Sequence, residues 1–161
     1  AVVLMENTSP INPARARKTI PITTRRVGEI YSTGRTTFAV VGVSQDPTKY
    51  GYELFEILTK HGHTVLPVNP KYDQIDGQPC YPSLAALPKA PDAVVSAISP
   101  SGAAKLAETC VEQKITVLWM PPGTDSEEAL QICQSNQITA FHGICPIFVL
   151  NMPRDRWKDL P

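Results

Sequence analysis

The sequence lacks several features that would point to particular classes of protein. Its longest apolar runs, such as Ile115–Met120, are far shorter than the roughly 20 residues that a membrane-spanning helix needs. Lys and Arg together number 15, and Asp and Glu also number 15, so the formal net charge is zero. No overall field therefore attracts nucleic acid or an anionic membrane, and we expect neither as a partner. Any site for an anion must be local.

Paired cysteines are also absent. The four cysteines are scattered, form no C-x-x-C pair and have no histidine at zinc-finger spacing. They are Cys80, Cys110, Cys133 and Cys145. We expect all four to be reduced and none to hold a metal, which favours a cytoplasmic protein.

The chain changes character at Thr36. Residues 1–35 are rich in cations and proline, and they show no helical or strand periodicity. We interpret them as a basic N-terminal arm that packs on the domain or on a partner subunit of a homo-oligomer. A mitochondrial presequence is the alternative, and Met5 is a candidate native start because the first residue is Ala1.

The C-terminal end is a second candidate contact with a partner. Residues 36–150 are predicted to form one domain, and residues 151–161 a tail. Trp157 lies among charged residues in this tail, a pattern that favours docking through an aromatic anchor, also across a subunit interface.

The domain alternates apolar runs with segments of helical periodicity. Strands are predicted at residues 38–43, 64–68, 92–98, 115–120 and 138–141. Helical spacing of apolar residues predicts helices around residues 51–58, 103–110 and 129–133. Thr124 with Glu127, or Asp125 with Glu128, would form a capping box at the start of the third helix. This alternation predicts an α/β fold, a Rossmann-like, doubly wound parallel sheet of about five strands in a single three-layer domain.

The loop after the first predicted strand is the first candidate site, because ligands of such sheets bind beyond the carboxyl ends of the strands. Gly42 allows a tight turn, and Ser44 and Lys49 precede a helix whose N-terminus suits an anion. The loop has neither G-x-G-x-x-G nor a P-loop sequence, so a plain strand-to-helix turn is the alternative. The candidate residues are Gly42, Val43, Ser44, Gln45, Lys49 and Tyr50.

The loop after the second predicted strand adds a cation. It reads Val68-Asn69-Pro70-Lys71, whereas NAD-binding Rossmann domains place Asp or Glu there for the ribose hydroxyls. Lys71 favours an adenosine that carries an extra phosphate, as in coenzyme A or NADP. An exposed lysine in a proline-rich turn is the alternative.

Two further strand ends complete the candidate set. Ile98-Ser99-Pro100 would let a ligand lie against the backbone, although Ser and Pro suit a helix start equally well. His142 reads either as an acid or base or as a structural residue, and Cys145 either as a reactive thiol or as a buried small residue. No nucleophile and base can be paired, so we name no catalytic residue.

The ordered set of motifs resembles a known family. Gly42-x-Ser44-x-Asp46-Pro47-x-Lys49-x-Gly51, Pro67–Lys71, Tyr81–Leu84 and Cys145-Pro146 occur as in small bacterial coenzyme-A-binding proteins. These proteins are similar to the nucleotide-binding domain of the succinyl-CoA synthetase α subunit. Relatives often have an arginine before the Cys-Pro pair, where this chain has Gly143-Ile144.

The resemblance implies a role for each candidate loop. The loop of Ser44 and Lys49 would hold the pyrophosphate of coenzyme A, and Asn69 and Lys71 would meet the phosphorylated adenosine. The remaining positions would line the path of the adenine or pantetheine: Ile98, Ser99 and Pro100, with Trp119 and Met120 bordering the cleft after the fourth strand.

These observations lead to one main hypothesis and two alternatives. The main hypothesis is a stand-alone domain that binds coenzyme A or a short acyl-CoA as carrier, sensor or subunit, without catalysis of its own. The first alternative is an NADP-dependent oxidoreductase, which Lys71 would equally serve. The second is a scaffold with a degenerate nucleotide-binding fold, whose basic arm binds another protein.

Overall fold

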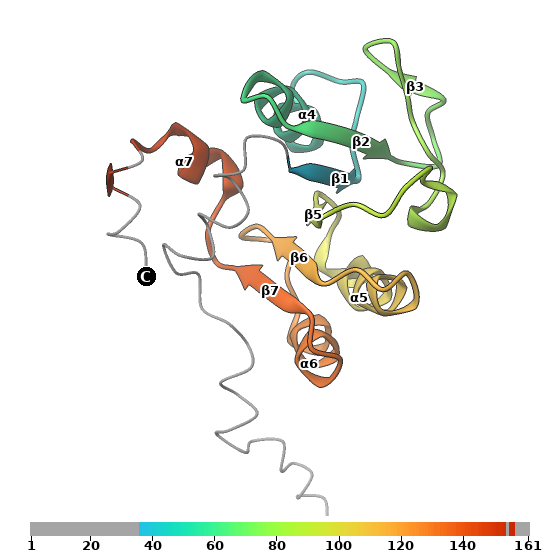
Figure 1. Ribbon diagram of the computed structural model, residues 1–161, viewed down its shortest axis with the longest axis vertical. Coiled ribbons are helices and arrows are strands. Elements are labelled where there is room, and N and C mark those ends of the chain that lie inside the picture. Colours follow the sequence, from blue (N-terminus) through green and yellow to red (C-terminus); the bar gives the residue numbers. More distant parts are fainter. Residues whose placement is uncertain (1–35, 154, 157–161) are drawn as a thin grey trace, which may run out of the picture.

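A computed structural model describes residues 36–153, 155 and 156 of the chain. Their centre is a five-stranded parallel sheet with the order β2-β1-β5-β6-β7 (Figure 1). Its strands are β1 Thr37–Val41, β2 Thr64–Val68, β5 Ala93–Ser96, β6 Val117–Met120 and β7 Thr139–His142. The α/β prediction is confirmed, with strand ends shifted by at most two residues. The predicted arm, residues 1–35, and Trp157 of the predicted tail lie outside the described residues.

Helices cover both faces of the sheet, which makes the domain three-layered. The α-helices are α4 Tyr50–Lys60, α5 Ala103–Glu112, α6 Glu127–Ser135 and α7 Pro146–Asn151. Phe38 and Val40 of β1 pack with α4 and α7 in one core cluster, whereas Ala39 packs with α5 and α6 in the other. This separation follows from the alternation of side chains along a strand. None of these helices is long and apolar enough to span a membrane within the described part of the chain.

The topology reverses between β1 and β5. The chain leaves β1 through α4 to reach β2 on one side, and later enters β5 on the other side of β1. In open α/β sheets the carboxyl ends of two such strands form the ligand crevice. The β1–β5 edge is therefore where the fold positions a site.

The edge strand β2 contains a proline without losing its register. A proline has no N–H to donate to the ladder, so the sequence alone suggests an irregular strand end at Pro67. That expectation is wrong, because Pro67 pairs with Val40 inside the regular strand. An edge strand tolerates proline because the missing N–H faces away from the sheet. The outer edge is covered instead by Tyr81, whose N–H donates to the Pro67 carbonyl over 2.9 Å.

The predicted capping box at the third helix is also wrong. The N-cap of α6 is Ser126, whose hydroxyl accepts the Ala129 N–H over 3.1 Å. The Thr124 hydroxyl instead donates to the Pro121 carbonyl over 2.7 Å, within the turn that follows β6. The helix begins after this turn, so Thr124 and Asp125 lie too early in the chain to cap it.

Short elements connect β2 to β5. The antiparallel pair β3 Gln74–Ile75 and β4 Gln78–Pro79 projects beyond α4 and β2, and a 3-10 helix, η2 Leu84–Ala86, follows it (Figure 1). A second 3-10 helix, η3 Pro100–Gly102, leads into α5. Leu84 of η2 is buried against the α5 side of the sheet, so η2 forms one boundary of the crevice at this edge.

Candidate functional site

The carboxyl ends of β1, β2 and β5 are tied to one another by backbone hydrogen bonds. The Gly42 N–H donates to the Val68 carbonyl over 2.9 Å, and the Ala97 N–H donates to the Val41 carbonyl over 2.7 Å. Gly42 turns the chain with φ of +95°, and a Cβ there would lie 2.8 Å from the Ala97 carbonyl oxygen. Only glycine therefore fits at this turn.

The first loop, defined here as residues 42–49, carries an internal hydrogen-bond network. The Ser44 hydroxyl accepts the Asp46 N–H over 3.0 Å. The Asp46 carboxylate accepts the Thr48 N–H over 2.9 Å and the Thr48 hydroxyl over 2.7 Å. These bonds, first the one from the Thr48 N–H, lower the pKa of Asp46 below its usual value, so the carboxylate is ionised at neutral pH.

The N-terminus of α4 lies directly against this loop. Lys49 is the N-cap residue, makes no side-chain capping bond and is exposed. A Cβ on the buried Gly51 would collide with the Gly42 carbonyl and lie 3.0 Å from Val43 Cα. The close approach brings the first N–H groups of α4, which have no intrahelical acceptor, to the edge of the loop. A helix N-terminus with an adjacent lysine suits a phosphate.

Asn69 links the first loop to the chain that follows β2. Its side-chain amide donates to the Val43 carbonyl over 2.8 Å, and its amide oxygen accepts the Lys71 N–H over 2.9 Å. Its backbone N–H donates to the Tyr81 carbonyl over 2.9 Å. The half-buried Asn69 is thus engaged with protein groups, while Pro70 and Lys71 beside it are exposed.

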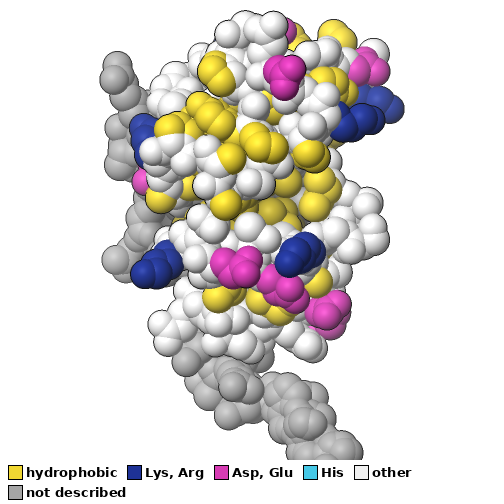
Figure 2. All heavy atoms as spheres, turned by 90° about the vertical axis from the view of Figure 1, so that its right-hand side faces the viewer, with side chains coloured by type: hydrophobic (Ala, Val, Ile, Leu, Met, Phe, Trp, Pro, Cys, Tyr) yellow, Lys and Arg dark blue, Asp and Glu magenta, His cyan; other side chains and the backbone are white. Residues whose placement is uncertain are grey.

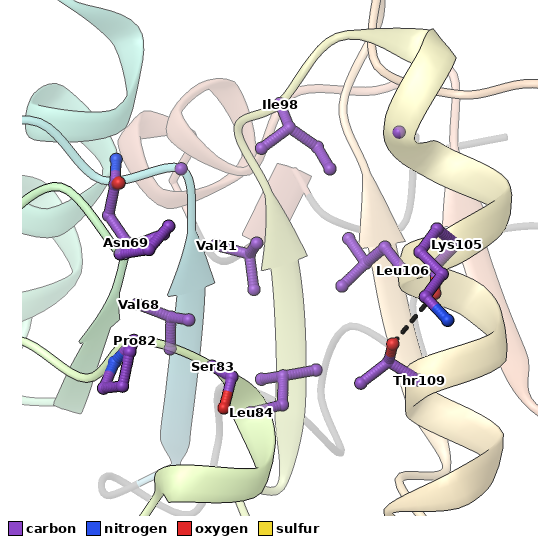
Figure 3. Close-up of a pocket in the computed structure, with 13 residues that line it drawn as sticks. Val41, Val68, Asn69, Pro82, Ser83, Leu84, Ile98, Lys105, Leu106 and Thr109 are labelled. Atoms are coloured by element: carbon purple, nitrogen blue, oxygen red, sulfur yellow. Dashed lines mark hydrogen bonds between the residues drawn. The ribbon is translucent and has the colours of Figure 1, made fainter.

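An apolar groove of about 270 Å³ opens next to these loops, on the α5 side of the sheet. Val41 and Val68 form its floor, η2 one wall and α5 the other, with Asn69 and Ile98 toward the carboxyl edge (Figure 3). In the space-filling view, hydrophobic side chains gather around the hollow on this face (Figure 2). The groove exists because α5 and α6 pack with each other over one part of the sheet and leave β1 and β2 to the shorter η2.

Several groove residues were missed from the sequence. Ser83 and Leu84 come from η2 and the residue before it, and Lys105, Leu106 and Thr109 come from α5. Lys105 and Thr109 are four residues apart, so they share one helix face, and the Thr109 hydroxyl donates to the Lys105 carbonyl over 2.9 Å (Figure 3). The signal available in the sequence was a lysine in the first turn of the helix that follows Ile98-Ser99-Pro100.

The structure places the predicted residues in different surroundings. The groove is lined by Gly42, Val68, Asn69, Pro70 and Ile98. Other predicted positions lie in the loops beside it: Ser44, Gln45, Lys49, Lys71, Ser99 and Pro100. The side chain of Val43 is fully buried beneath the first loop.

Trp119 and Met120 do not border the groove. Both are fully buried, in the two core clusters on opposite faces of β6. The Trp119 indole donates to the Ile144 carbonyl over 2.8 Å and packs edge-on against Phe141 with ring centroids 5.1 Å apart. They come from the end of a central strand whose side chains fill the core, so we leave them out of the proposed binding surface.

Tyr50 and Cys145 form a contact on the α4 side. The Tyr50 hydroxyl and the Cys145 sulfur are 3.0 Å apart. Burial, and next the hydrogen bond to Cys145, raise the pKa of Tyr50, so the phenol is protonated at neutral pH. Cys145 is half-buried, and His142 is exposed at the end of β7.

The other three cysteines are buried core residues. Burial raises the pKa of Cys110 to about 12 and that of Cys133 to about 11. Burial also raises the pKa of Cys80. These thiols are therefore protonated at neutral pH and unreactive.

Comparison with known proteins agrees with this architecture. An ADP-forming acetate–CoA ligase from Archaeoglobus fulgidus is 36% identical over 72 residues, which are 45% of this chain and 10% of the ligase. A conserved hypothetical protein from Pyrococcus furiosus superposes with a TM-score of 0.67 at 37% identity, over 71% of this chain and 97% of that protein. A dinucleotide-forming acetyl-coenzyme A synthetase from Candidatus Korarchaeum cryptofilum shares the fold, with a TM-score of 0.59 at 24% identity, over 65% of this chain and 25% of the synthetase.

The family match spans the whole described domain. The matched residues make up only about a tenth of the length of each curated ligase, so the chain matches one part of those proteins. The sequence profile of the CoA binding domain matches residues 36–151, which include every strand of the sheet, the first loop and the groove. The chain therefore belongs to the CoA binding domain family.

Proposed function

We propose that the chain binds coenzyme A or a short acyl-CoA across the β1–β5 edge of its sheet. The observation that carries the proposal is the juxtaposition of a glycine turn, a helix N-terminus and an apolar groove with lysines beside it. Coenzyme A has matching parts, since a charged pyrophosphate joins a flat base on one side to a long pantetheine arm on the other.

The pyrophosphate is assigned to the first loop. Backbone N–H groups at the start of α4 and the Lys49 ammonium supply positive charge there, and the glycine at position 42 lets a phosphate approach the backbone closely. The Asp46 carboxylate is an unfavourable neighbour for a phosphate, but two hydrogen bonds from Thr48 hold it. The Ser44 hydroxyl offers a further donor at this position.

The adenosine is assigned to the groove. A volume of about 270 Å³ between apolar walls suits a planar base but is too small for the whole cofactor. Lys105 lies on the α5 wall and Lys71 beside the opposite rim, and both are exposed. Their ammonium groups are placed to interact with the 3′-phosphate at little desolvation cost.

The pantetheine arm is assigned to the path beside Ile98, Ser99 and Pro100. Ser99 and Pro100 are exposed and lie after β5, next to the first loop. We assign no catalytic residue to this chain. The proposed role is that of a carrier, sensor or subunit that presents the cofactor to a partner, since the ligases contain much chain beyond the matched part.

Lys71 would serve NADP as well as coenzyme A, but the comparisons give no support to NADP. The family match favours coenzyme A, because the matched profile is that of a CoA binding domain. A scaffold role would leave the loop and groove unused, and it predicts that no nucleotide stabilises the fold.

A thermal-shift comparison with coenzyme A, dephospho-coenzyme A, NADP and NAD tests these readings. A ligand at about 100 times its Kd should stabilise the native state by about 2.7 kcal/mol, which raises Tm by several degrees. We expect the largest shift with coenzyme A and a smaller one without the 3′-phosphate. A shift with NADP alone would replace coenzyme A by NADP, and no shift with any of the four would overturn the proposal.

A further inference from the structure

We infer that Asn69 is a positioning residue for phosphate recognition: it sets the backbone at Lys71 and the orientation of the Val43 carbonyl through its own side-chain amide. This inference rests on the proposed function and deepens it. It replaces the expectation that the Asn69 side chain itself meets the ligand.

The backbone of Asn69 is held firmly enough to serve as an anchor. It follows the last residue of β2, and its N–H donates to the Tyr81 carbonyl over 2.9 Å. Its carbonyl accepts the Cys80 thiol over 3.6 Å and the Tyr72 N–H over 3.4 Å. Because this backbone is fixed, the Asn69 side chain has few alternative positions. The protein groups to which it hydrogen-bonds are therefore held in place as well.

The side chain joins two loops that are far apart in the sequence. The amide nitrogen donates to the Val43 carbonyl over 2.8 Å, and the amide oxygen accepts the Lys71 N–H over 2.9 Å. A planar amide has a donor at one end and an acceptor at the other, which both contacts need. Aspartate lacks the donor, and alanine lacks both groups.

The bond to Lys71 shapes the chain beside the groove. A side-chain oxygen that accepts the N–H two residues later closes an Asx-turn, which here bends the chain around Pro70. The backbone at Lys71 is thereby fixed, and the ammonium group starts from a defined position. Without the turn, the lysine would have more conformations to lose when it meets a phosphate.

The bond to Val43 acts on the other loop. The Val43 carbonyl belongs to the peptide that joins Val43 to Ser44, in the turn to which we assign the pyrophosphate. The carbonyl oxygen carries a partial negative charge, and its hydrogen bond to Asn69 directs that charge into the protein. Loss of the bond would free the peptide to rotate and bring its oxygen toward the phosphate.

The two bonds predict two separable effects. Asn69→Ala loses both bonds, so we expect the affinity for coenzyme A to fall roughly tenfold or more. Its preference for coenzyme A over dephospho-coenzyme A should also shrink, because that preference depends on Lys71. Asn69→Ser keeps a hydroxyl that closes the same turn more weakly, but it is too short to reach Val43. Asn69→Ser should therefore lower the affinities for both ligands by a similar factor and keep most of the preference for coenzyme A.

Isothermal titration calorimetry of a double-mutant cycle tests the inference on the full chain. The proteins are wild type, Asn69→Ala, Asn69→Ser, Lys71→Gln and the double variant Asn69→Ala/Lys71→Gln, each with both ligands. If Asn69 acts through Lys71, then Asn69→Ala lowers the ligand preference in wild type but not in the Lys71→Gln background. An unchanged preference in Asn69→Ala, with wild type discriminating the ligands, would overturn it.

Asn136→Ala is the matched control. The Asn136 amide donates to the Ile132 carbonyl over 2.8 Å at the end of α6, so this variant also removes an amide–carbonyl bond. We expect it to leave both affinities unchanged. If Asn69→Ala does not fold, Asn69→Ser and Lys71→Gln still compare the two effects. Failure of wild type to bind either ligand would instead contradict the proposed function.

Discussion

The first loop and the groove meet at the same edge of the sheet, but they are built in different ways. The first loop is a continuous stretch of eight residues, 42–49, held by its own polar bonds and by contacts with α4 and Asn69. The groove is apolar, and its residues come from five segments between Val41 and Thr109. Local chemistry thus forms one half of the proposed site, and the spacing of the layers forms the other half.

This contrast predicts that the two halves respond to different substitutions. The loop depends on close backbone approach, so small additions of volume should disrupt it. The groove is an open space, so only a large side chain should block it.

The largest effect is expected from Gly51→Ala. Its Cβ would collide with the Gly42 carbonyl, which is backbone and cannot swing aside, so α4 must shift away from the first loop. We expect a loss of stability of roughly 1–3 kcal/mol, as for other overpacked sites, together with loss of coenzyme A binding. Chemical denaturation measures the stability, and isothermal titration calorimetry measures the binding of coenzyme A.

Glu56→Ala, on the exposed face of α4, is the control for this prediction. It should change neither stability nor binding by a comparable amount. Wild-type stability in Gly51→Ala would contradict the view that close packing of α4 builds the loop.

A smaller and more selective effect is expected from Thr109→Phe. Thr109 is half-exposed on the α5 wall, so a phenyl ring there would fill the groove while leaving the fold and the first loop intact. Affinity for coenzyme A should fall about tenfold or more, whereas 4′-phosphopantetheine, which has no base, should bind as to wild type. Competition calorimetry compares the two ligands.

Thr59→Phe offers a matched control on the opposite layer. The Thr59 hydroxyl bonds to the Phe55 carbonyl over 2.7 Å in α4, as Thr109 bonds to Lys105 in α5. It should leave both affinities unchanged. An equal loss for both ligands in Thr109→Phe would contradict the assignment of the base to the groove.

Thiol labelling compares the outer parts of the molecule with its core. Cys145 should react first with a maleimide at pH 8, because it is half-buried whereas the other three cysteines are buried. The pKa values of about 12 for Cys110 and about 11 for Cys133 keep those thiols protonated at this pH. Mass spectrometry of the native protein and of Cys145→Ser checks the order, and early labelling of Cys110 would contradict it.

The smallest effect concerns the pH response of the first loop. The pKa of Asp46 is lower in the folded protein, chiefly because of the Thr48 N–H. The ionised carboxylate therefore stabilises the loop above the ordinary aspartate pKa, and this contribution is lost as pH falls through the lower folded value. Carboxyl NMR titration should show a pKa of Asp46 below that of an ordinary aspartate. In Thr48→Val this pKa should be closer to the ordinary value. The variant keeps the Thr48 N–H and loses only the hydroxyl, so identical titrations would contradict a contribution from the hydroxyl bond.

The fold was predictable because its signals are local. The alternation of buried strands and amphipathic helices marks all five strands of the sheet, and Gly42 marks the turn after β1 by a conformation that only glycine adopts easily. Helix starts were harder. The sequence pointed to Thr124 or Asp125 as the cap of the third helix, but Thr124 bonds within the turn after β6 and Ser126 caps the helix.

The site was less predictable than the fold. Sequence position places Asn69 and Trp119 alike at strand ends, but the structure engages the first between two loops and buries the second in the core. Lys105 and Thr109 belong to the helix α5 and to no strand end, and they line the groove because α5 forms one of its walls.

The sequence by itself determined the α/β alternation, the turn at Gly42 and the lysines near the carboxyl edge, because each depends on the properties of neighbouring residues. Only the tertiary structure decided which side chains face the groove and which are held by protein contacts. Facing and burial depend on how layers pack, and packing joins residues such as Val43 and Asn69 that are 26 positions apart in the chain.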